Sequence, residues 1–419
     1  MIVSNSVAPG ITSAQNSDRR HLRVALYSSG VVGLGHMRRS LLIAEAMSKS
    51  PLEPVILMLA DARQAGSFAM PASMDCITLP AIMKNPDGSF LPRYLSVTTA
   101  SVLQIRSQML LSVVEAFQPD ILVVDNVPHG VLGELEVVLA HLRAVGNTRV
   151  VLGMRDVLDD AESVKIEWAK LDNQSFIVNN YDEVWVYGDR MLNDVVHEYE
   201  FCDELAAKIR YTGYLDQSAR IHCTPDDEMV DLNAHELCPG NYNLCLVGGG
   251  QDGAALAHAF AGASMPRGQL GLVVAGPFMP EPHRVRLHQI AAGNRAIRVM
   301  DFAKEPTILL KHARSVVAMG GYNTTMEVLS FKKRALLVPR VKPRSEQMVR
   351  AERLRDMGLV SVLHPDRASS SAITSWLNSP NTAKQHSRPA LDMGGVPRVA
   401  DFLANPLPRT LASRSLSLI

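Results

Sequence analysis

The segment from 315 to 354 constrains the fold of this chain most strongly. An apolar strand at 315–319 leads into Gly320 and Gly321, a helix entered through 323–325, and a second apolar strand at 335–338. Strand, glycine turn, helix and strand make half of a βαβ unit. Such a turn leaves unpaired backbone N–H groups at the positive end of the helix, where an anion such as a phosphate binds.

The same residues allow a purely structural interpretation, because Thr324 and Glu327 have the spacing of a capping box that fixes a helix start. A second element of the same kind favours a ligand site. The apolar strand at 243–247 is followed by the loop GGGQDG at 248–253, with Gln251 as a polar group. Consecutive glycines permit close approach of the backbone to a ligand.

Two series of short apolar strands alternate with helical stretches along the chain. The first series is at 23–28, 55–59, 76–79, 121–124, 149–153 and 183–186, and the second at 243–247, 271–275, 297–301, 315–319, 335–338 and 360–363. This alternation predicts parallel sheets that helices cover on both faces. We therefore predict an α/β fold with two tandem Rossmann-like doubly wound domains facing a cleft. The predicted parts are a flexible tail (1–20), an N-terminal domain (21–217), a linker (218–240), a C-terminal domain (241–395) and a C-terminal tail (396–419).

Composition limits the classes of function. A length of 419 residues suits two or three domains. The formal net charge is zero and aromatic residues make up 5%, so nucleic acid is not an expected partner. The five cysteines are dispersed, without metal-type spacing, and the N-terminus lacks an apolar signal region, so we expect a cytoplasmic protein and no metal site.

The turn after the first strand supplies candidate acid–base groups. Gly33 and Gly35 precede His36, whose neutral imidazole can take a proton from an attacking hydroxyl or simply bond the loop. Arg38 and Arg39 fall in the first helical turn, where the helix dipole disfavours cations. We interpret them as counter-charges for an anionic ligand, with surface solvation as the alternative.

Other candidates stand at predicted strand ends. Asp125 can orient His36 or bind acceptor hydroxyls, and Arg155 and Asp156 occupy a similar position; each carboxylate can alternatively cap the following helix. Phe302 can lie beside a flat base or belong to the core.

The order of motifs resembles a known family. GLGH (33–36), YTGYL (211–215), GGGQDG (248–253), GGYNTTMEVLSF (320–331) and VPR with EQ and RAERL (338–354) are similar to GT-B glycosyltransferases, in particular the family 28-like group. That group includes the N-acetylglucosaminyltransferase of peptidoglycan lipid II synthesis. The similarity covers most of 21–365 and is strongest in the C-terminal half.

The resemblance implies an inverting, metal-independent glycosyltransferase of the hexosyltransferase type. It would move a sugar from a nucleotide-sugar co-substrate, usually a UDP-sugar, to an acceptor hydroxyl, without a cofactor. It implies that Glu327 holds the ribose, the 320–325 turn the diphosphate, and Glu346 and Gln347 the sugar. Residues and resemblance together predict donor binding by Gly249, Gly250, Gln251, Phe302, Gly320, Gly321, Asn323, Thr324, Glu327, Glu346 and Gln347, catalysis by His36 and Asp125, and an acceptor side at Gly33, Gly35, Arg38, Arg39 and Arg155.

Several alternatives stay open. The segments 78–95 and 125–130 do not resemble the peptidoglycan enzyme. The acceptor is therefore an unknown small molecule, polysaccharide or lipid-linked compound. Peripheral contact with the inner face of the membrane is an associated hypothesis.

A nucleotide-sugar epimerase would need converging carboxylates, for which Asp125, Asp156 and Glu346 are available. A silent nucleotide-sugar-binding protein is a third hypothesis. A nicotinamide oxidoreductase, with Asp61 as the ribose acid, is a fourth.

Overall fold

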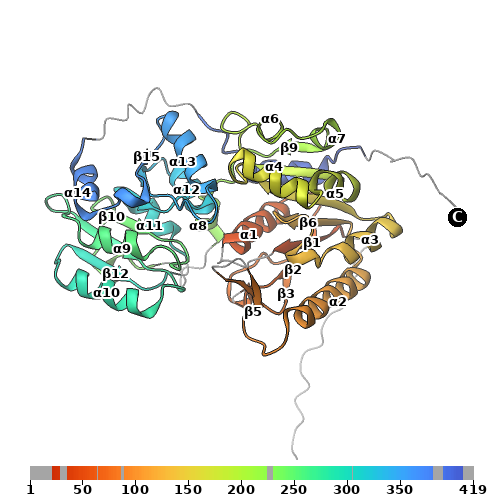
Figure 1. Ribbon diagram of the computed structural model, residues 1–419, viewed down its shortest axis with the longest axis horizontal. Coiled ribbons are helices and arrows are strands. Elements are labelled where there is room, and N and C mark those ends of the chain that lie inside the picture. Colours follow the sequence, from red (N-terminus) through yellow and green to blue (C-terminus); the bar gives the residue numbers. More distant parts are fainter. Residues whose placement is uncertain are drawn as a thin grey trace, which may run out of the picture.

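The chain folds into two lobes, each built on a parallel sheet (Figure 1). The structure is a computed structural model and describes residues 21–28, 35–63, 65–85, 89–223, 230–303, 305–380 and 390–408. The N-terminal lobe holds the first sheet and the C-terminal lobe the second. The prediction of an α/β protein with two tandem Rossmann-like domains is confirmed.

The N-terminal lobe has a seven-stranded sheet in the order β3-β2-β1-β6-β7-β8-β9. Its strands are β1 (Arg23–Ser28), β2 (Val55–Ala60), β3 (Met74–Thr78), β6 (Ile121–Asp125), β7 (Arg149–Arg155), β8 (Glu183–Tyr187) and β9 (Ile209–Tyr211). Its helices are α1 (Gly35–Ser48), α2 (Thr99–Phe117), α3 (Glu136–Val145), α4 (Ala161–Lys170), α5 (Asn173–Asn180), α6 (Val195–Glu198) and α7 (Asp203–Ala206). A separate antiparallel hairpin, β4 (Ile82–Lys84) with β5 (Phe90–Pro92), precedes α2.

The C-terminal lobe has a six-stranded sheet in the order β12-β11-β10-β13-β14-β15. Its strands are β10 (Tyr242–Leu246), β11 (Leu270–Val274), β12 (Ile297–Met300), β13 (Ser315–Ala318), β14 (Arg334–Leu337) and β15 (Ser361–Val362). Its helices are α9 (Ala254–Ala261), α10 (Glu281–Ala292), α11 (Thr307–His312), α12 (Tyr322–Ser330), α13 (Glu346–Asp356) and α14 (Ser370–Asn378). In both sheets the strand order reverses beside the first strand, between β1 and β6 and between β10 and β13, where doubly wound folds bind ligands.

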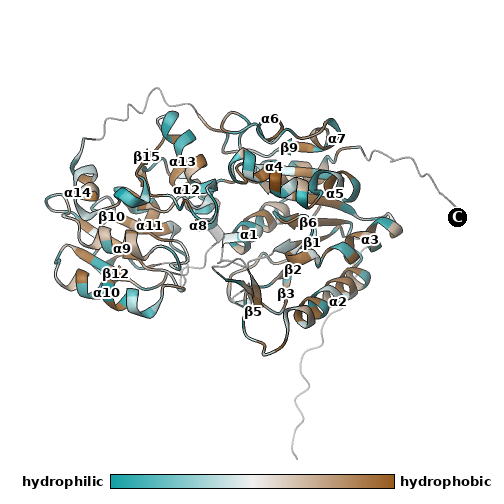
Figure 2. Cartoon of the chain, in the orientation of Figure 1, coloured by the Kyte–Doolittle hydropathy of each residue, from teal (hydrophilic) through white to brown (hydrophobic). Residues whose placement is uncertain are grey.

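Continuous apolar strands explain why both sheets are covered on two faces (Figure 2). Every residue of β6 and β10 is buried. Along β1, Val24 and Leu26 pack with α1, whereas Ala25 and Tyr27 pack on the opposite face with α2 and α3. The loops that follow the carboxyl ends of the strands in both sheets lie at the junction of the two lobes.

The predicted C-terminal tail and the predicted linker both contain regular structure. Residues 396–404, placed in the predicted tail, belong to α15 (Gly395–Ala404), which packs on α1 of the N-terminal lobe. Its apolar stripe is buried, and Phe402 lies 5.8 Å from the Trp185 ring. The predicted linker contains the helix α8 (Ala219–Cys223) and a short turn at Asn233–His235. The apolar side chains that α15 buries stabilise this helix. The polar sequence around them makes this apolar stripe hard to recognise.

The chain passes from the N-terminal to the C-terminal lobe after Leu215 and has returned to the N-terminal lobe by Gly394, and these two segments lie side by side. Leu215 and Gly394 form an isolated antiparallel bridge. The Tyr214 amide donates to the Asp392 carbonyl at 2.7 Å, and the Gly395 amide donates to the Tyr214 carbonyl at 3.0 Å. The outgoing and returning segments are therefore joined by backbone hydrogen bonds.

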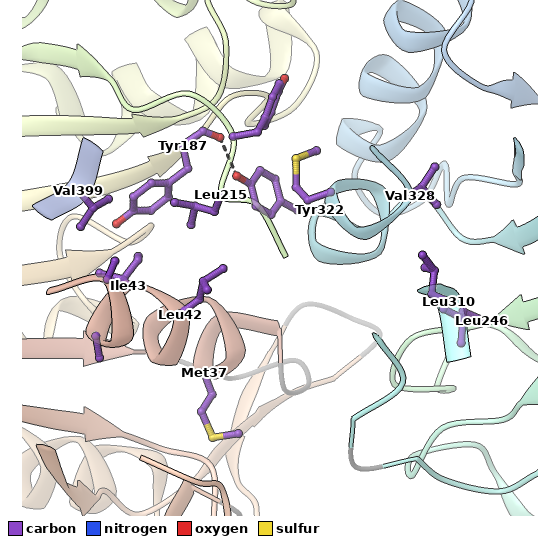
Figure 3. Packing of buried hydrophobic residues seen from close by; sticks show 14 of the residues in the cluster. Met37, Leu42, Ile43, Tyr187, Leu215, Leu246, Leu310, Tyr322, Val328 and Val399 are labelled. Carbon is purple, nitrogen blue, oxygen red and sulfur yellow. Dashed lines mark hydrogen bonds between the residues drawn. The ribbon is translucent and has the colours of Figure 1, made fainter. Parts of the chain in front are cut away.

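A single apolar cluster runs through the junction of the lobes (Figure 3). It joins Met37 and Leu42 of α1 to Tyr322 and Val328 of α12. The Tyr322 hydroxyl donates to the carbonyl of Tyr187 at 2.8 Å, a contact drawn in the same view. Buried apolar contacts therefore hold α1 and α12 against each other.

Ion pairs and hydrogen bonds reinforce this junction along α13. Arg350 pairs with Asp156 at 3.0 Å, and both side chains are buried. Asp156 also accepts a hydrogen bond of 2.7 Å from the Tyr214 hydroxyl. Arg353 pairs with Glu198 at 2.8 Å closer to the surface. The helix that follows the VPR motif is thus fixed to the N-terminal lobe.

Among the described residues, no helix has both the length and the apolar character needed to cross a bilayer.

Candidate functional site

A cavity of about 440 Å³ lies between the lobes, at the carboxyl ends of their strands. Its walls come from the start of α1, the loop after β10, the start of α12 and the start of α13. The lining residues are Gly35, His36, Arg38, Arg39, Lys84, Arg155, Leu246, Val247, Gly248, Gly249, Gly250, Gln251, Asp252, Val274, Gly276, Pro277, Phe278, Phe302, Ala303, Pro306, Met319, Gly321, Tyr322, Asn323, Thr324, Glu327, Arg340, Pro343, Arg344, Glu346 and Gln347. Its size and position suit a ligand bound at the switch points of both sheets.

The start of α12 faces this cavity without a side-chain cap. Gly321 is the N-cap residue, and among the described residues no side-chain cap bonds the first amides of the helix. The capping-box interpretation of Thr324 and Glu327 is therefore wrong, since the helix begins before Thr324 and Glu327 lies in its second turn. Uncapped amides at a helix start attract anions through their partial positive charge.

The second glycine loop approaches the neighbouring strand end closely. Gly250 has φ +87°, and a Cβ there would lie 2.3 Å from the Ala275 carbonyl oxygen. Gly276 has φ +85°, and its Cβ would lie 2.5 Å from the Gly248 carbonyl oxygen. Side chains at these positions would separate the two loops, so glycine keeps the backbone itself as the cavity wall.

His36, Asp125 and Arg39 form a compact group on the N-terminal side. His36 Nδ1 lies 2.7 Å from Asp125 Oδ2, and Arg39 Nη2 donates to both Asp125 oxygens at 2.8 Å. Burial raises the pKa of Asp125, but Arg39 and then His36 outweigh it, so the pKa is lowered overall. Because Asp125 is then an ionised acceptor, the hydrogen of His36 belongs on Nδ1, and Nε2 keeps its lone pair.

Arg39 is fixed by more than Asp125. Its side chain is buried, and its guanidinium lies 5.7 Å from the Tyr187 ring and 5.4 Å from the Tyr322 ring. Burial lowers the pKa of Arg39, but the negative charge of Asp125 and then the Tyr322 side chain raise it by more than burial lowers it. The pKa of Arg39 therefore rises overall. The group stays charged and holds the Asp125 carboxylate in place.

Arg155 and Glu346 connect the lobes at the cavity wall. Arg155 Nη1 lies 2.5 Å from Glu346 Oε2, and Arg155 Nε donates to Asn126 Oδ1 at 3.2 Å. Asn126 has a left-handed backbone with φ 66°, an unusual conformation that often occurs at functional sites. Burial raises the pKa of Glu346, but Arg155 and then Arg350 lower it more, and the pKa falls.

The side chains of Gln347 and Glu327 both accept hydrogen bonds from neighbouring residues. Gln347 Oε1 accepts from the Arg340 amide at 3.0 Å, which orients its side chain at the cavity edge. Glu327 is buried, and its Oε1 accepts from Arg220 Nη1 at 2.9 Å. Both residues nevertheless line the cavity.

The described lining has an excess of positive charge. It contains the cations Arg38, Arg39, Lys84, Arg155, Arg340 and Arg344 and the acids Asp252, Glu327 and Glu346. Six cations face three carboxylates in a recess where water screens charge poorly, so the field favours an anionic ligand.

The structure brings most of the predicted site residues to this one cavity. Asp125 lies behind His36, outside the lining. Gly320 packs instead against the start of α13, where its Cβ would lie 3.3 Å from the Gln347 carbonyl oxygen. Gly33 lies outside the described residues. Phe302 is 45% exposed and lines the cavity, so it is not a core residue.

The sequence analysis missed several lining residues. Arg340 is the arginine of the motif VPR, two residues past the predicted strand at 335–338, and this position was a usable signal. Lys84 belongs to the β4–β5 hairpin, and Phe278 follows β11; neither sits in a recognisable pattern. Arg93 of the same hairpin region lies 5.8 Å from the Phe278 ring, so this part of the N-terminal lobe reaches the loop after β11 in the C-terminal lobe.

Asp61, the ribose acid of the nicotinamide hypothesis, has another role. Its Oδ2 lies 3.7 Å from Arg106 Nη1, and both side chains are buried. Arg106 also bonds Glu134 through Nε and Nη2, and the pKa of Arg106 is raised, since Glu134 and the other acids outweigh burial. Asp61 is therefore part of the internal support of the N-terminal lobe.

Solved structures share this architecture, although no protein-family model and no curated protein matches the chain. The calicheamicin glycosyltransferase CalG4 is 15% identical, with 93% of this chain and 100% of that chain covered and a TM-score of 0.57. MurG from Acinetobacter baumannii is 13% identical, with coverage of 91% and 99% and a TM-score of 0.54. The UDP-GlcNAc 2-epimerase from Neisseria meningitidis, bound to UDP-GlcNAc, is 10% identical, with coverage of 91% and 98% and a TM-score of 0.59.

These similarities define the class of fold. The chain has the GT-B architecture of two Rossmann-like lobes with a cavity between them, and the predicted resemblance is confirmed at the level of the fold. Glycosyltransferases and epimerases share this fold, so the chemistry has to be argued from the site.

Proposed function

We propose that this protein is an inverting glycosyltransferase that moves a sugar from a nucleotide-sugar donor, most simply a UDP-sugar, to an acceptor hydroxyl. The observation that carries the proposal is the His36–Asp125 pair on one wall of the cavity, facing the uncapped start of α12 on the other. A base on one side and an anion site on the other are the two requirements of glycosyl transfer from a diphosphate.

His36 is the proposed general base. Asp125 accepts from its Nδ1–H group, and Arg39 holds Asp125 in place, which leaves Nε2 to accept the proton of the acceptor hydroxyl. The acceptor oxygen forms a bond to the anomeric carbon while the bond from that carbon to the diphosphate oxygen breaks. The bonding electrons leave with the nucleoside diphosphate, and the single displacement inverts the anomeric centre.

The departing diphosphate is the second charge to be stabilised. The amides at the start of α12 and the arginines of the cavity supply donors and positive charge at that place. We therefore propose that transfer needs no metal. A transfer rate unchanged by EDTA supports this proposal, and a rate restored only by a divalent cation contradicts it.

A nucleotide-sugar epimerase is the second candidate, since solved epimerases share the fold. That chemistry needs two or more carboxylates converging on the hexose. Asp156 is instead buried against Arg350 and Tyr214, and Asp125 is held behind His36, so Glu346 is left as the cavity carboxylate among these three. Incubation with a UDP-sugar alone separates the two functions, because epimerisation without an acceptor would establish the second.

A thermal-shift screen of nucleotide sugars tests the donor and identifies it. A ligand at about 100 times its Kd adds ~2.7 kcal/mol to the free energy of unfolding. We expect a UDP-sugar to raise Tm and NAD(H) to leave it unchanged. Stabilisation without turnover across a broad panel of acceptors would indicate a silent binding protein instead.

Glu327 is the proposed ribose ligand. Replacement by alanine removes a charged acceptor for the ribose hydroxyls, so we expect UDP to bind about ten- to a hundredfold more weakly. Isothermal titration calorimetry measures the change, and Glu352→Ala, on the exposed side of α13, is the control. Equal UDP affinity in Glu327→Ala and the unmodified protein would contradict the proposed donor site.

A further inference from the structure

Arg220 contacts the proposed ribose ligand from the segment that joins the lobes. It lies on α8, in the predicted linker, but its side chain is only 7% exposed. Arg220 Nη1 donates to Glu327 Oε1 at 2.9 Å, and Arg220 Nη2 donates to Glu305 Oε2 at 2.5 Å. A buried cation bridging two carboxylates is costly to place, which points to a specific role.

The contact with Arg220 favours the charged form of Glu327. Thr307 Oγ lies 3.2 Å from Glu327 Oε1, but its single hydrogen is closer to Glu305 Oε1. Burial raises the pKa of Glu327, Arg220 opposes the rise and Glu305 adds to it, so that the pKa is raised overall. Arg38 of α1 is the other cation acting on Glu327, and burial and then Arg220 lower the pKa of Arg38 itself.

Loss of the guanidinium would therefore change what Glu327 offers to a ligand. Two neighbouring buried carboxylates would share Arg38, and the pKa of Glu327, which burial already raises, would rise further. A neutral carboxyl group loses the charge-assisted hydrogen bonds that an ionised one accepts from hydroxyl groups.

We infer that Arg220 is a positioning residue for ribose recognition, which holds Glu327 charged and fixed at the cavity wall. The inference rests on the proposed function, because it takes Glu327 to bind the ribose. Arg220 thereby ties nucleotide binding to the segment that connects the lobes, although it does not itself line the cavity.

Comparing a nucleotide that has ribose hydroxyls with one that lacks them isolates the contribution of these hydroxyls to the binding affinity. Calorimetric titrations with UDP and with 2′,3′-dideoxy-UDP compare the unmodified protein with Arg220→Gln, Arg220→Lys and Glu327→Ala. For Arg220→Gln we expect UDP affinity to fall about tenfold and dideoxy-UDP affinity to stay within about twofold. Arg220→Lys keeps a cation and should recover most of the UDP affinity. Arg353→Gln, which removes a different ion pair between the lobes, should leave both affinities unchanged.

A pH series gives a second, independent result. In Arg220→Gln, UDP affinity relative to dideoxy-UDP should increase as pH rises from about 6 to about 9, because Glu327 regains its charge. The dideoxy compound corrects for titration of the diphosphate. In the unmodified protein this ratio should change little over the same interval.

The outcomes distinguish the inference from the proposed function. If Glu327→Ala leaves UDP affinity unchanged, the ribose site itself is wrong. If Glu327→Ala weakens UDP but Arg220→Gln does not, or if Arg220→Gln weakens both nucleotides equally, the donor site stands and the role of Arg220 is overturned.

Discussion

Replacing His36 with alanine should lower the rate of sugar transfer about a hundred- to ten-thousandfold, because general-base assistance contributes that much to such reactions. His36 is 23% exposed at the cavity wall, and its Nδ1 is held 2.7 Å from Asp125. UDP affinity should change less than about twofold, since the proposed donor contacts lie on the other lobe. Release of UDP measures the transfer, with the identified acceptor or with water.

His129 provides a matched control. It stacks on Phe176 with ring centroids 3.7 Å apart, bonds Glu136, and does not line the cavity. His129→Ala should therefore transfer sugar at nearly the unmodified rate. A His36→Ala variant that keeps its rate, or that loses UDP affinity in proportion to rate, would remove His36 from the role of base.

Replacing Arg350 with alanine should destabilise the protein by about 3–5 kcal/mol, the cost of leaving a buried charge without its partner. Arg350 is the buried partner of Asp156, which also accepts from Tyr214 at the crossing between the lobes. Burial lowers the pKa of Arg350, but Asp156 and Glu346 raise it more, so the arginine remains charged. Urea unfolding followed by circular dichroism measures the free energy of unfolding.

Arg353, three residues further along α13, is the control for this variant. It pairs with Glu198 across the same junction, but both side chains are more than a quarter exposed. Exposed pairs contribute up to about 1 kcal/mol, so Arg353→Ala should be only mildly destabilising. Equal losses in the two variants would show that burial of the Arg350 pair has no special effect.

The sequence predicted the fold well because the relevant signals are local. Apolar strands, glycine turns and helical stretches recur within short windows, and the predicted strand positions agree with the main strands of both sheets. The full extent of α15 and its packing on the N-terminal lobe were not predicted, because its apolar stripe is short and its partner, α1, lies more than 340 residues earlier in the chain. The three-residue strand β9 likewise lies at a sheet edge and has no strong pattern.

The candidate site was predictable only in part. His36, Asp125 and the 320–325 turn stand at strand ends, where the rules for parallel sheets place ligands. The buried pairs Arg220–Glu327 and Arg350–Asp156 could not be inferred, because their members are 107 and 194 residues apart. No spacing in the sequence encodes such pairs. Arg220 was also not recognised as a site residue because the polar sequence around it indicated a linker.

The paired backbone crossings near Leu215 and Gly394 have a mechanical consequence. Two antiparallel segments joined by backbone hydrogen bonds act as one connection instead of two independent ones. Sliding one segment along the other would break the contacts of Tyr214 with Asp392 and Gly395. A relative movement of the lobes that keeps these hydrogen bonds must therefore carry both segments together.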